Sequence, residues 1–437
     1  MRKIRTYPQL ILYAMSGLGI NLLNTVMNSY LCSALLVGGF AESVLPYQTY
    51  MQRDLVLPAL WAAFVFAAKL IDGVIDVPMA SFSDNLHTRW GRRRPAIAIG
   101  LAVLILSYVL FLAVPNGGGA TLLNTVYYGL LLCLFYTFYT LTMVTYYATF
   151  TEIVDTEDAR RFISNTKSVF DIVYFILGYV VVRLLLNNIN IRLVALTALP
   201  PALTMLIPLF MIREDPSTGT AERAKTVGLV ESLRCTVKNR RFIRWMVIYS
   251  FMTMGVQLFL SGINEYFSFV GMNMIYVMGV SFVPVPFTLR LYNKILKKRG
   301  FVFAFRYILI AFSVGMLAMF AVARLDAGNA KTLLSILCGL ICSLAIGAMF
   351  SVAYSVPAQM AAEAEAESGV SNSAMYFAVQ GLFAGVATGI GSGVILTALK
   401  GGENARSGMI VLLPLIAAAA TLVSCILSFA LPKPHQK

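Results

Sequence analysis

Long apolar runs separated by short polar segments dominate the chain from one end to the other. A helix needs about 20 consecutive apolar residues to cross a bilayer, and this pattern predicts about twelve such helices. The predicted spans are residues 9–38, 55–83, 96–114, 121–150, 163–186, 193–212, 243–268, 272–293, 303–323, 332–357, 371–399 and 408–431. The predicted fold class is therefore an all-α integral membrane protein.

The longest polar segment begins at Arg213 and falls near the middle of the chain. A basic loop around Gly91 after the second predicted span has a counterpart around Gly300 after the eighth, which gives weak support for an internal repeat. Repeated six-span halves are typical of transporters. We therefore predict three parts, listed here in chain order: an N-terminal six-helix half at 1–212, a central cytoplasmic linker at 213–242 and a C-terminal six-helix half at 243–437.

The composition agrees with a membrane protein, because 59% of the residues are hydrophobic and only 12% are charged. The net charge of +14 does not indicate a nucleic-acid partner, because the charges lie between the apolar runs. Most of the 34 Lys and Arg fall on the side that holds both termini, whereas Arg183 and Lys400 count among the few on the opposite side. Positive charge marks the cytoplasmic side, so we predict a multi-pass protein of the cell membrane with both termini cytoplasmic.

Cysteine and histidine give no sign of a metal site or an enzyme. The six cysteines lie mostly within apolar segments without metal-ligand spacing, and the two histidines lie in a basic loop and in the tail. We therefore predict no metal site, no catalytic residue, no enzymatic activity and no cofactor other than a coupling ion.

Three ionisable residues interrupt the second predicted span: Lys69, Asp72 and Asp76 share one helical face at positions i, i+3 and i+7. Each charge costs roughly 2.5–3.5 kcal/mol inside a spanning helix, so a structural ion pair or a functional site must compensate. Two carboxylates one turn apart can bind a small cation or share a proton, with Lys69 neutralising one of them. The corresponding positions of the second half are uncharged: Met278, Ser281 and Val285. We therefore expect the ionic chemistry mainly in the first half.

An acidic residue and a basic cluster follow this span. They could form a latch between conformations, or simply anchor the loop at lipid headgroups. The latch residues are Asp84, Arg89, Arg92, Arg93 and Arg94.

Aromatic and hydroxyl side chains crowd the predicted span 121–150, among them Tyr139, Thr140 and Tyr147. Such side chains suit a sugar or another amphipathic solute, although Thr also satisfies backbone carbonyls in membrane helices. In the next span, Lys167 and Asp171 stand at i and i+4 and can either pair with each other or contact a solute. In span 371–399, glycine at every fourth residue indicates close helix packing: Gly381, Gly385, Gly389 and Gly393.

Residues 66–95 resemble the second span and following loop of the glycoside–pentoside–hexuronide:cation symporters, the melibiose permease family of the major facilitator superfamily. The shared features are two Asp four residues apart, a nearby Pro, and the loop Arg89-Trp-Gly-Arg-Arg-Arg-Pro95. Residues 139–160 are similar to a second motif of that family, and 360–393 more weakly to a third. The resemblance covers nearly the whole chain and implies a major facilitator fold.

The resemblance implies that Asp72, Asp76 and Thr140 form the cation site, with Lys69 as a basic partner. It places Asn21, Tyr147 and Lys167 among the sugar contacts. Two acids of the family's pocket are replaced by Asn21 and Met143, and its span-eleven lysine has no counterpart near Gln380, which argues against galactoside binding as in melibiose permease. The predicted solute contacts are Asn21, Tyr139, Met143, Tyr147, Lys167, Asp171 and Gln380.

The predicted function is cation-coupled secondary active transport of a small solute, a sugar or glycoside, by alternating access. The coupling ion is H⁺ or Na⁺, and the loss of two pocket acids favours H⁺ modestly. The expected partners are the solute, the cation and the lipid bilayer, and a monomer is expected. The alternatives are transport of a non-sugar amphipathic solute such as a lysolipid and, less favoured, a receptor that transports nothing.

Overall fold

The structure is a computed structural model of the whole chain. It describes residues 6–40, 45–76, 78–79, 82, 86, 88, 90–91, 93–154, 156–212, 238–368, 373–401 and 408–430. The predicted linker at 213–242 therefore lies almost entirely outside the described residues, and its boundaries stay a prediction.

The first group of helices contains five long helices and several shorter ones. Its members are α1 (Tyr7–Val26), extended by the turns η1 (Met27–Leu31) and η2 (Ser33–Leu35), then α2 (Leu45–Gln48), α3 (Pro58–Val74), α5 (Arg93–Phe111), α6 (Leu122–Glu152), α7 (Glu157–Ile176), η4 (Leu177–Val181), α8 (Val182–Leu185), α9 (Ile191–Leu196), α10 (Leu199–Ala202), η5 (Leu203–Met205) and α11 (Leu206–Met211).

The second group begins after the central segment. Its members are α13 (Arg240–Ser261), α14 (Ile263–Val270), α15 (Met274–Phe282), α16 (Val285–Arg299), α17 (Phe301–Val322), α18 (Asn329–Ser368), α19 (Ser373–Thr388), η7 (Gly389–Ile395), α20 (Leu396–Lys400), η8 (Met409–Leu412), α22 (Leu413–Leu427) and η9 (Ser428–Ala430).

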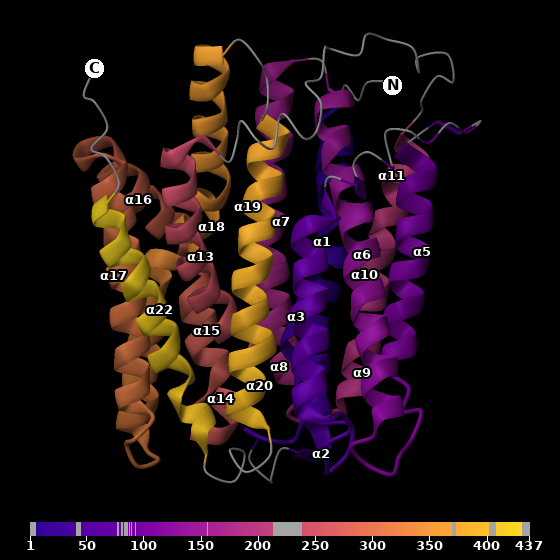
Figure 1. The fold of residues 1–437 in the computed structure, drawn as a ribbon, viewed down its shortest axis with the longest axis vertical. Coiled ribbons are helices and arrows are strands. Elements are labelled where there is room, and N and C mark those ends of the chain that lie inside the picture. The colour runs from indigo at the N-terminus through magenta and orange to yellow at the C-terminus, as the bar shows by residue number, and fades with distance from the viewer. Residues whose placement is uncertain are drawn as a thin grey trace.

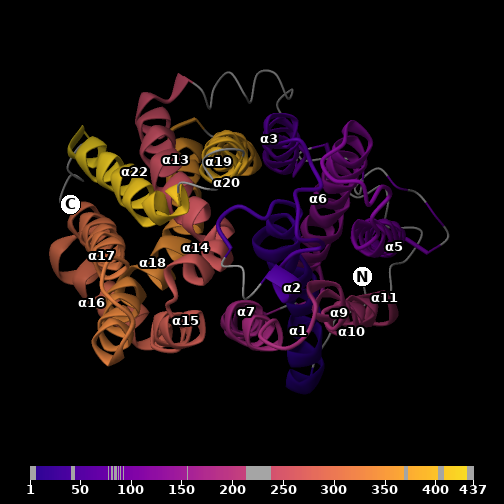
Figure 2. The ribbon, with the colours of Figure 1, turned by 90° about the horizontal axis from the view of Figure 1, so that it is seen from below.

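The two groups stand side by side as two bundles, with α3 next to α19 and α7 next to α15 where they meet (Figure 2). Both ends of the chain lie at the same end of the molecule, and α2 lies at the opposite end (Figure 1). We call the latter the α2 end and the former the terminal end.

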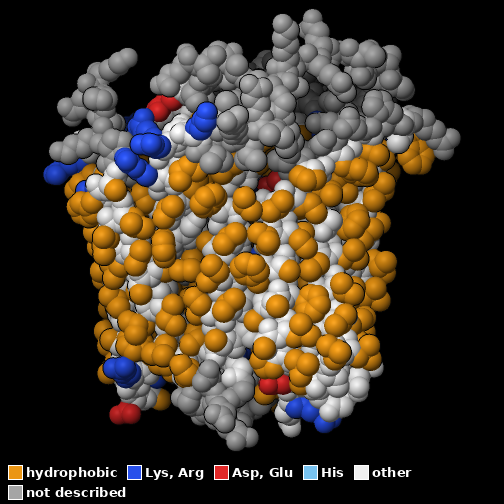
Figure 3. Space-filling view, viewed as in Figure 1, with side chains coloured by type: hydrophobic (Ala, Val, Ile, Leu, Met, Phe, Trp, Pro, Cys, Tyr) orange, Lys and Arg blue, Asp and Glu red, His pale blue; other side chains and the backbone are white. Residues whose placement is uncertain are grey.

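Membrane-length helices account for the predicted spans. Among the described residues, ten helices are long and apolar enough to cross a membrane, and α15 with α16, bent by 44°, makes up to eleven. The helix α3 is described over 17 residues and corresponds to the remaining predicted span. Apolar side chains cover the visible middle of the molecule, while charged side chains collect toward its two ends (Figure 3). The predicted all-α, multi-span architecture is confirmed.

Glycines hold α3 and α19 close together where the two groups meet. A methyl group on Gly73 would lie 2.2 Å from the carbonyl oxygen of Gly381, and one on Gly385 would lie 2.6 Å from that of Lys69. Neither position can accept a side chain without moving backbone, so these two helices are in direct backbone contact. The helix that carries the predicted cation site is therefore held against the second group through its glycine face.

Candidate functional site

The helix α6 presents two rows of polar and aromatic side chains to different neighbours. Tyr136 and Thr140, one turn apart, contact side chains of α3. Tyr139, Met143 and Tyr147, also spaced by one turn, approach α1 and α7. Because positions i and i+4 share a face, a single helix serves two sites.

The α3 row brings the predicted cation residues together. The Thr140 hydroxyl donates a hydrogen bond to Oδ1 of Asp72 at 3.2 Å. The ammonium of Lys69 donates to the Tyr136 hydroxyl at 2.6 Å, and the structure shows no ion pair between the described side chains of Lys69 and Asp72. Asp76 lies one turn closer to the terminal end, and a methyl group added to its neighbour Gly381 would lie 3.7 Å from Oδ2. Lys69, Asp72 and Asp76 are all partly buried.

Six of the seven predicted solute contacts lie on α1, α6 and α7. The Tyr139 hydroxyl donates to Oδ1 of Asn21 at 3.1 Å. The ammonium of Lys167 lies 5.0 Å from the centre of the Tyr147 ring and 2.5 Å from Oδ2 of Asp171. Lys167 and Asp171 therefore pair with each other, which is one of the two roles that their spacing allows, and contact with a solute stays a prediction.

The remaining predicted solute contacts, Met143 and Gln380, are buried and pack against other helices. The end of the Met143 side chain lies 3.6 Å from where a methyl group on Gly17 would stand, so it fills space against α1. Gln380 lies apart on α19, where Nε2 donates to the carbonyl of Ala353 at 2.6 Å. It joins α19 to α18 and does not contact the first group through this bond.

Only part of the predicted latch falls within the described residues. Arg93 is buried and Arg94 partly buried at the start of α5. Asp84, Arg89 and Arg92 lie outside the described residues, so the latch stays a prediction.

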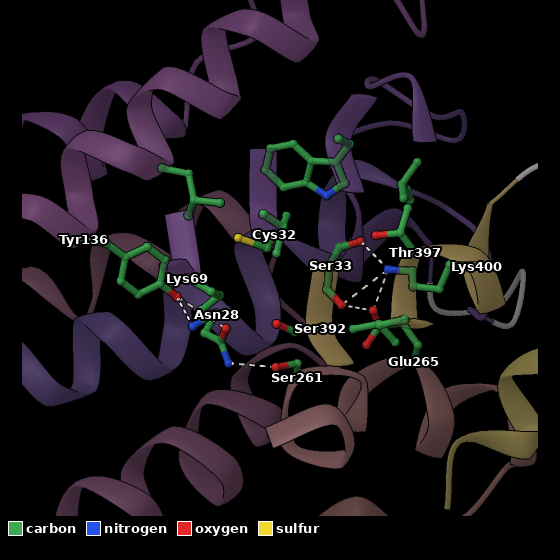
Figure 4. A pocket seen from close by; sticks show the side chains of 15 residues that line it. Asn28, Cys32, Ser33, Lys69, Tyr136, Ser261, Glu265, Ser392, Thr397 and Lys400 are labelled. Atoms are coloured by element: carbon green, nitrogen blue, oxygen red, sulfur yellow. Dashed lines mark hydrogen bonds and ion pairs between the residues drawn. The ribbon is translucent and has the colours of Figure 1, made fainter. Parts of the chain in front are cut away.

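A buried ion pair in the second group was missed from the sequence. Nζ of Lys400 lies 2.5 Å from Oε1 of Glu265, and their side chains are 3% and 0% exposed. The Ser33 hydroxyl of the first group donates to the same Glu265 oxygen, and Lys400 donates to the Ser33 carbonyl at 2.8 Å (Figure 4). The expectation that ionic chemistry belongs mainly to the first half is wrong to this extent.

The sequence did hold a signal for this pair. Glu265 falls inside the predicted span 243–268, so the criterion that singled out Asp72 applies to it equally. Lys400 falls one residue beyond the predicted span 371–399 and was counted with the charges of the opposite side, together with Arg183. In the structure the Arg183 and Lys400 side chains are buried, so neither is an exposed loop charge.

A small polar cavity connects the ion pair to the α3 row. It contains about 30 Å³ of space that water-sized molecules can occupy, and both groups contribute to its walls. Lys69, Tyr136 and Asn28 stand on one side and Ser33, Lys400 and Glu265 on the other (Figure 4). The Tyr136 hydroxyl donates to Asn28 at 3.4 Å, and the Asn28 amide donates to the Ser261 hydroxyl of the second group at 3.0 Å.

The polar side chains of the cavity and of the α3 row are better suited to hydrogen bonding and to binding a proton or a single cation than to tight metal coordination. Within the part of the chain that the structure describes, no group of three or more His, Cys, Asp or Glu could hold a metal ion. Asp72 with Thr140 offers a carboxylate and a hydroxyl, a set that can take a proton or an alkali cation.

Two bundles of membrane-length helices share a polar cavity, and a comparison with known protein families gives the class of protein. The chain belongs to the MFS/sugar transport protein family, whose profile matches residues 12–430. This match and the solved structures below confirm the major facilitator fold. A comparison with curated proteins found no match.

Several solved transporters share the fold at low sequence identity. The nucleoside transporter NupG is 15% identical, with a TM-score of 0.64 over 98% of this chain and 99% of that one. The xylose transporter XylE from E. coli, in an inward-open conformation, is 14% identical, with a TM-score of 0.62 over 98% of this chain and 97% of that one. A bacterial homologue of the lysosomal transporter Spinster is 12% identical, with a TM-score of 0.61 over 99% of this chain and 100% of that one. The family and these neighbours are transporters, which places the chain among transporters of small solutes rather than enzymes.

Proposed function

We propose that the protein is a cation-coupled secondary active transporter of a small hydroxylated solute, a sugar or glycoside, that works by alternating access. The observation that carries the proposal is the Asp72 carboxylate inside α3, bonded to the Thr140 hydroxyl with Lys69 one turn away. A charge at this depth costs free energy unless it has a role or a partner. Here its described hydrogen bond comes from a neutral hydroxyl, which leaves room for a cation.

Cation binding would act by changing the partners of Lys69. Before the cation binds, the ammonium of Lys69 can turn from Tyr136 toward Asp72 and neutralise it. When H⁺ or Na⁺ occupies Asp72 and Thr140, with Asp76 as a further carboxylate, Lys69 is released to Tyr136. The cation biases the two conformations only by the difference in its affinity for them. Contact of α3 with α19 provides a path from this site to the second group.

The solute class follows from the family and the side chains. The family description names sugar transport, and neighbours of the same fold are described as transporters of xylose and of nucleosides. All are hydroxylated rings, which suit the amide, phenol and ammonium groups of the predicted contacts. Asn21, Tyr139 and Tyr147 would bind hydroxyl groups, and the Lys167–Asp171 pair would offer both a donor and an acceptor.

The orientation and the moving parts complete the proposal. The terminal end would be cytoplasmic in the cell membrane, because the pattern of the sequence assigns most of the Lys and Arg to the side of the termini. Residues 1–212 and 243–437 would rock against each other as six-helix halves joined by 213–242. The loop with Asp84 and Arg89 to Arg94 would latch the cytoplasmic side, and the protein would act as a monomer.

The decisive experiment measures gradient-driven uptake in proteoliposomes. With an imposed proton or sodium gradient, Asp72→Asn and Asp76→Asn should each abolish accumulation of a labelled sugar, because neither amide can bind the cation as a carboxylate does. Asp54→Asn, outside α3 near the α2 end, is a matched control that should accumulate solute normally. Full accumulation by both α3 variants would refute the cation site.

One observation favours an amphipathic solute as the second candidate. An apolar groove of about 390 Å³ lies between α13 and α19, lined by side chains such as Phe251, Met254 and Phe383. A groove of this character would accept an acyl chain while the headgroup entered the cavity. Uptake of a labelled lysolipid, and not of sugars, by the same proteoliposomes would favour this candidate over the first.

A further inference from the structure

The two carboxylate oxygens of Glu265 differ in their partners. Oε1 accepts from Lys400 and from Ser33, whereas Oε2 is buried and has no hydrogen-bond partner among the described residues. Leaving a buried acceptor unsatisfied costs about 1–3 kcal/mol, and more when the group is charged. In a native structure such an atom needs an explanation, and a donor on a bound molecule would supply one.

The side chain of Glu265 lines the cavity that also contains Lys69. The ammonium of Lys69 carries three protons, and its described hydrogen bond to Tyr136 uses one of them. The cavity therefore has an acceptor at the α2 end and a donor at the α3 row. The Ser392 side chain lies between these two positions on the cavity wall, and Thr397 lies beside Lys400 (Figure 4).

This arrangement selects the charge of the occupant. An anion would meet the Glu265 carboxylate, and a cation would meet the ammonium groups of Lys69 and Lys400. A neutral hydroxyl group can donate to Glu265, and another on the same molecule can accept from Lys69. A ring with several hydroxyl groups satisfies both ends at once.

The cavity in this conformation has room for only about two water molecules. Its walls come from both groups, so its size depends on their separation. The helix α14 begins after a break at Gly262 and is bonded to the first group, with Arg183 donating to Asn264 at 2.9 Å and Ser268 donating to Gln48 at 3.0 Å. Moving α14 away from η1 and η2 would therefore enlarge the cavity.

We propose that this cavity is the closed form of a solute site shared by both groups, in which Glu265 accepts a hydrogen bond from a hydroxyl of a neutral polyhydroxylated solute and Lys69 donates to another. Lys400 holds the acceptor in place through Oε1. The inference rests on the proposed transport function, and it moves part of solute recognition from the first group to the second. The Asn21 and Tyr139 cluster then contacts the solute from the terminal side.

A native cysteine provides the test, because Cys32 lines the same cavity. In a variant whose other cysteines are replaced by serine, N-ethylmaleimide should alkylate Cys32 in the purified protein. Xylose, glucose, methyl glucoside and uridine are the probes, each titrated without any cation gradient. At least one should slow the alkylation of Cys32, and Glu265→Gln should raise the concentration needed for half-protection about tenfold, the loss expected for one hydrogen bond to a charged group.

Matched variants separate binding from folding. Glu363→Gln removes the carboxylate of an exposed ion pair in the same group and should leave protection unchanged. If Glu265→Gln folds poorly because Lys400 loses its partner, the double variant Glu265→Gln/Lys400→Met removes both charges and should fold, yet still require about tenfold more probe.

The outcomes distinguish this inference from the proposed coupling. Asp72→Asn should lose accumulation but retain protection of Cys32, because Asp72 does not line the cavity and Lys69 keeps its bond to Tyr136. Unchanged protection in both Glu265 variants, or no protection of the wild type by any probe, would overturn the inference. Neither result would bear on accumulation by Asp72→Asn, which tests coupling alone.

Discussion

The two charged regions of the protein differ in how their charges are held. In the first group, Asp72 and Lys69 are partly buried, and each has a described bond to a neutral hydroxyl. In the second, Glu265 and Lys400 are almost completely buried and bind each other directly. A charge held by a neutral group can exchange that partner for a cation at small cost, whereas a buried ion pair resists separation. The first region therefore suits coupling, and the second suits a fixed site.

The largest effect should come from breaking the pair in the second region. Lys400→Met leaves the Glu265 carboxylate buried without its counter-ion, which should destabilise the protein by about 3–5 kcal/mol. Thermal unfolding in detergent should show a clearly lower melting temperature. Adding Glu265→Gln to this variant should restore much of the stability, and an unchanged melting temperature for Lys400→Met alone would contradict the fixed-pair interpretation.

A smaller loss of stability should follow from pushing apart α3 and α19, the two helices through which the groups are in contact. Gly73→Ala places a methyl group 2.2 Å from the Gly381 carbonyl oxygen, and overpacking of this kind costs about 1–3 kcal/mol. Both thermal stability and uptake should fall, because α3 must move away from α19. Gly279→Ala, with no atom near the added methyl group, is the control and should behave like the wild type.

Within the first region, removing one hydroxyl should weaken cation binding moderately. Thr140→Val deletes the hydrogen bond to Asp72, worth about 1.5 kcal/mol or more with a charged acceptor. The sodium or proton concentration for half-maximal uptake should rise about tenfold, with little change in stability. Thr137→Val, whose hydroxyl bonds only to the Cys133 carbonyl of its own helix among the described contacts, should leave this concentration unchanged.

The smallest effect should come from an ion pair at the surface. Arg241 and Glu363 are 3.1 Å apart with side chains 46% and 42% exposed, so solvent screens them. Arg241→Met should change the free energy of unfolding by less than about 1 kcal/mol. If Arg241→Met lowered the free energy of unfolding as much as Lys400→Met does, solvent exposure would not explain the difference in stability between the two ion pairs.

The membrane spans and the α3 site could be predicted because both depend on residues that are close together in the sequence. Membrane length and apolar character are properties of consecutive residues, and Lys69, Asp72 and Asp76 share a face by helical spacing alone. The spacing of Gly381 and Gly385 likewise indicated close packing, and the structure supplies the partner helix, α3. The latch around Asp84 and the ion that couples transport stay predictions.

The partners of the charged side chains depended on contacts between distant segments. Glu265, Lys400 and Ser33 come from three separate parts of the chain, and no periodicity connects residues 33, 265 and 400. The sequence by itself determined a multi-span helical protein with a charged face on its second span. Only the tertiary structure decided that Lys69 faces Tyr136 and that a second buried pair closes the same cavity, because such bonds form between helices whose packing no local pattern encodes.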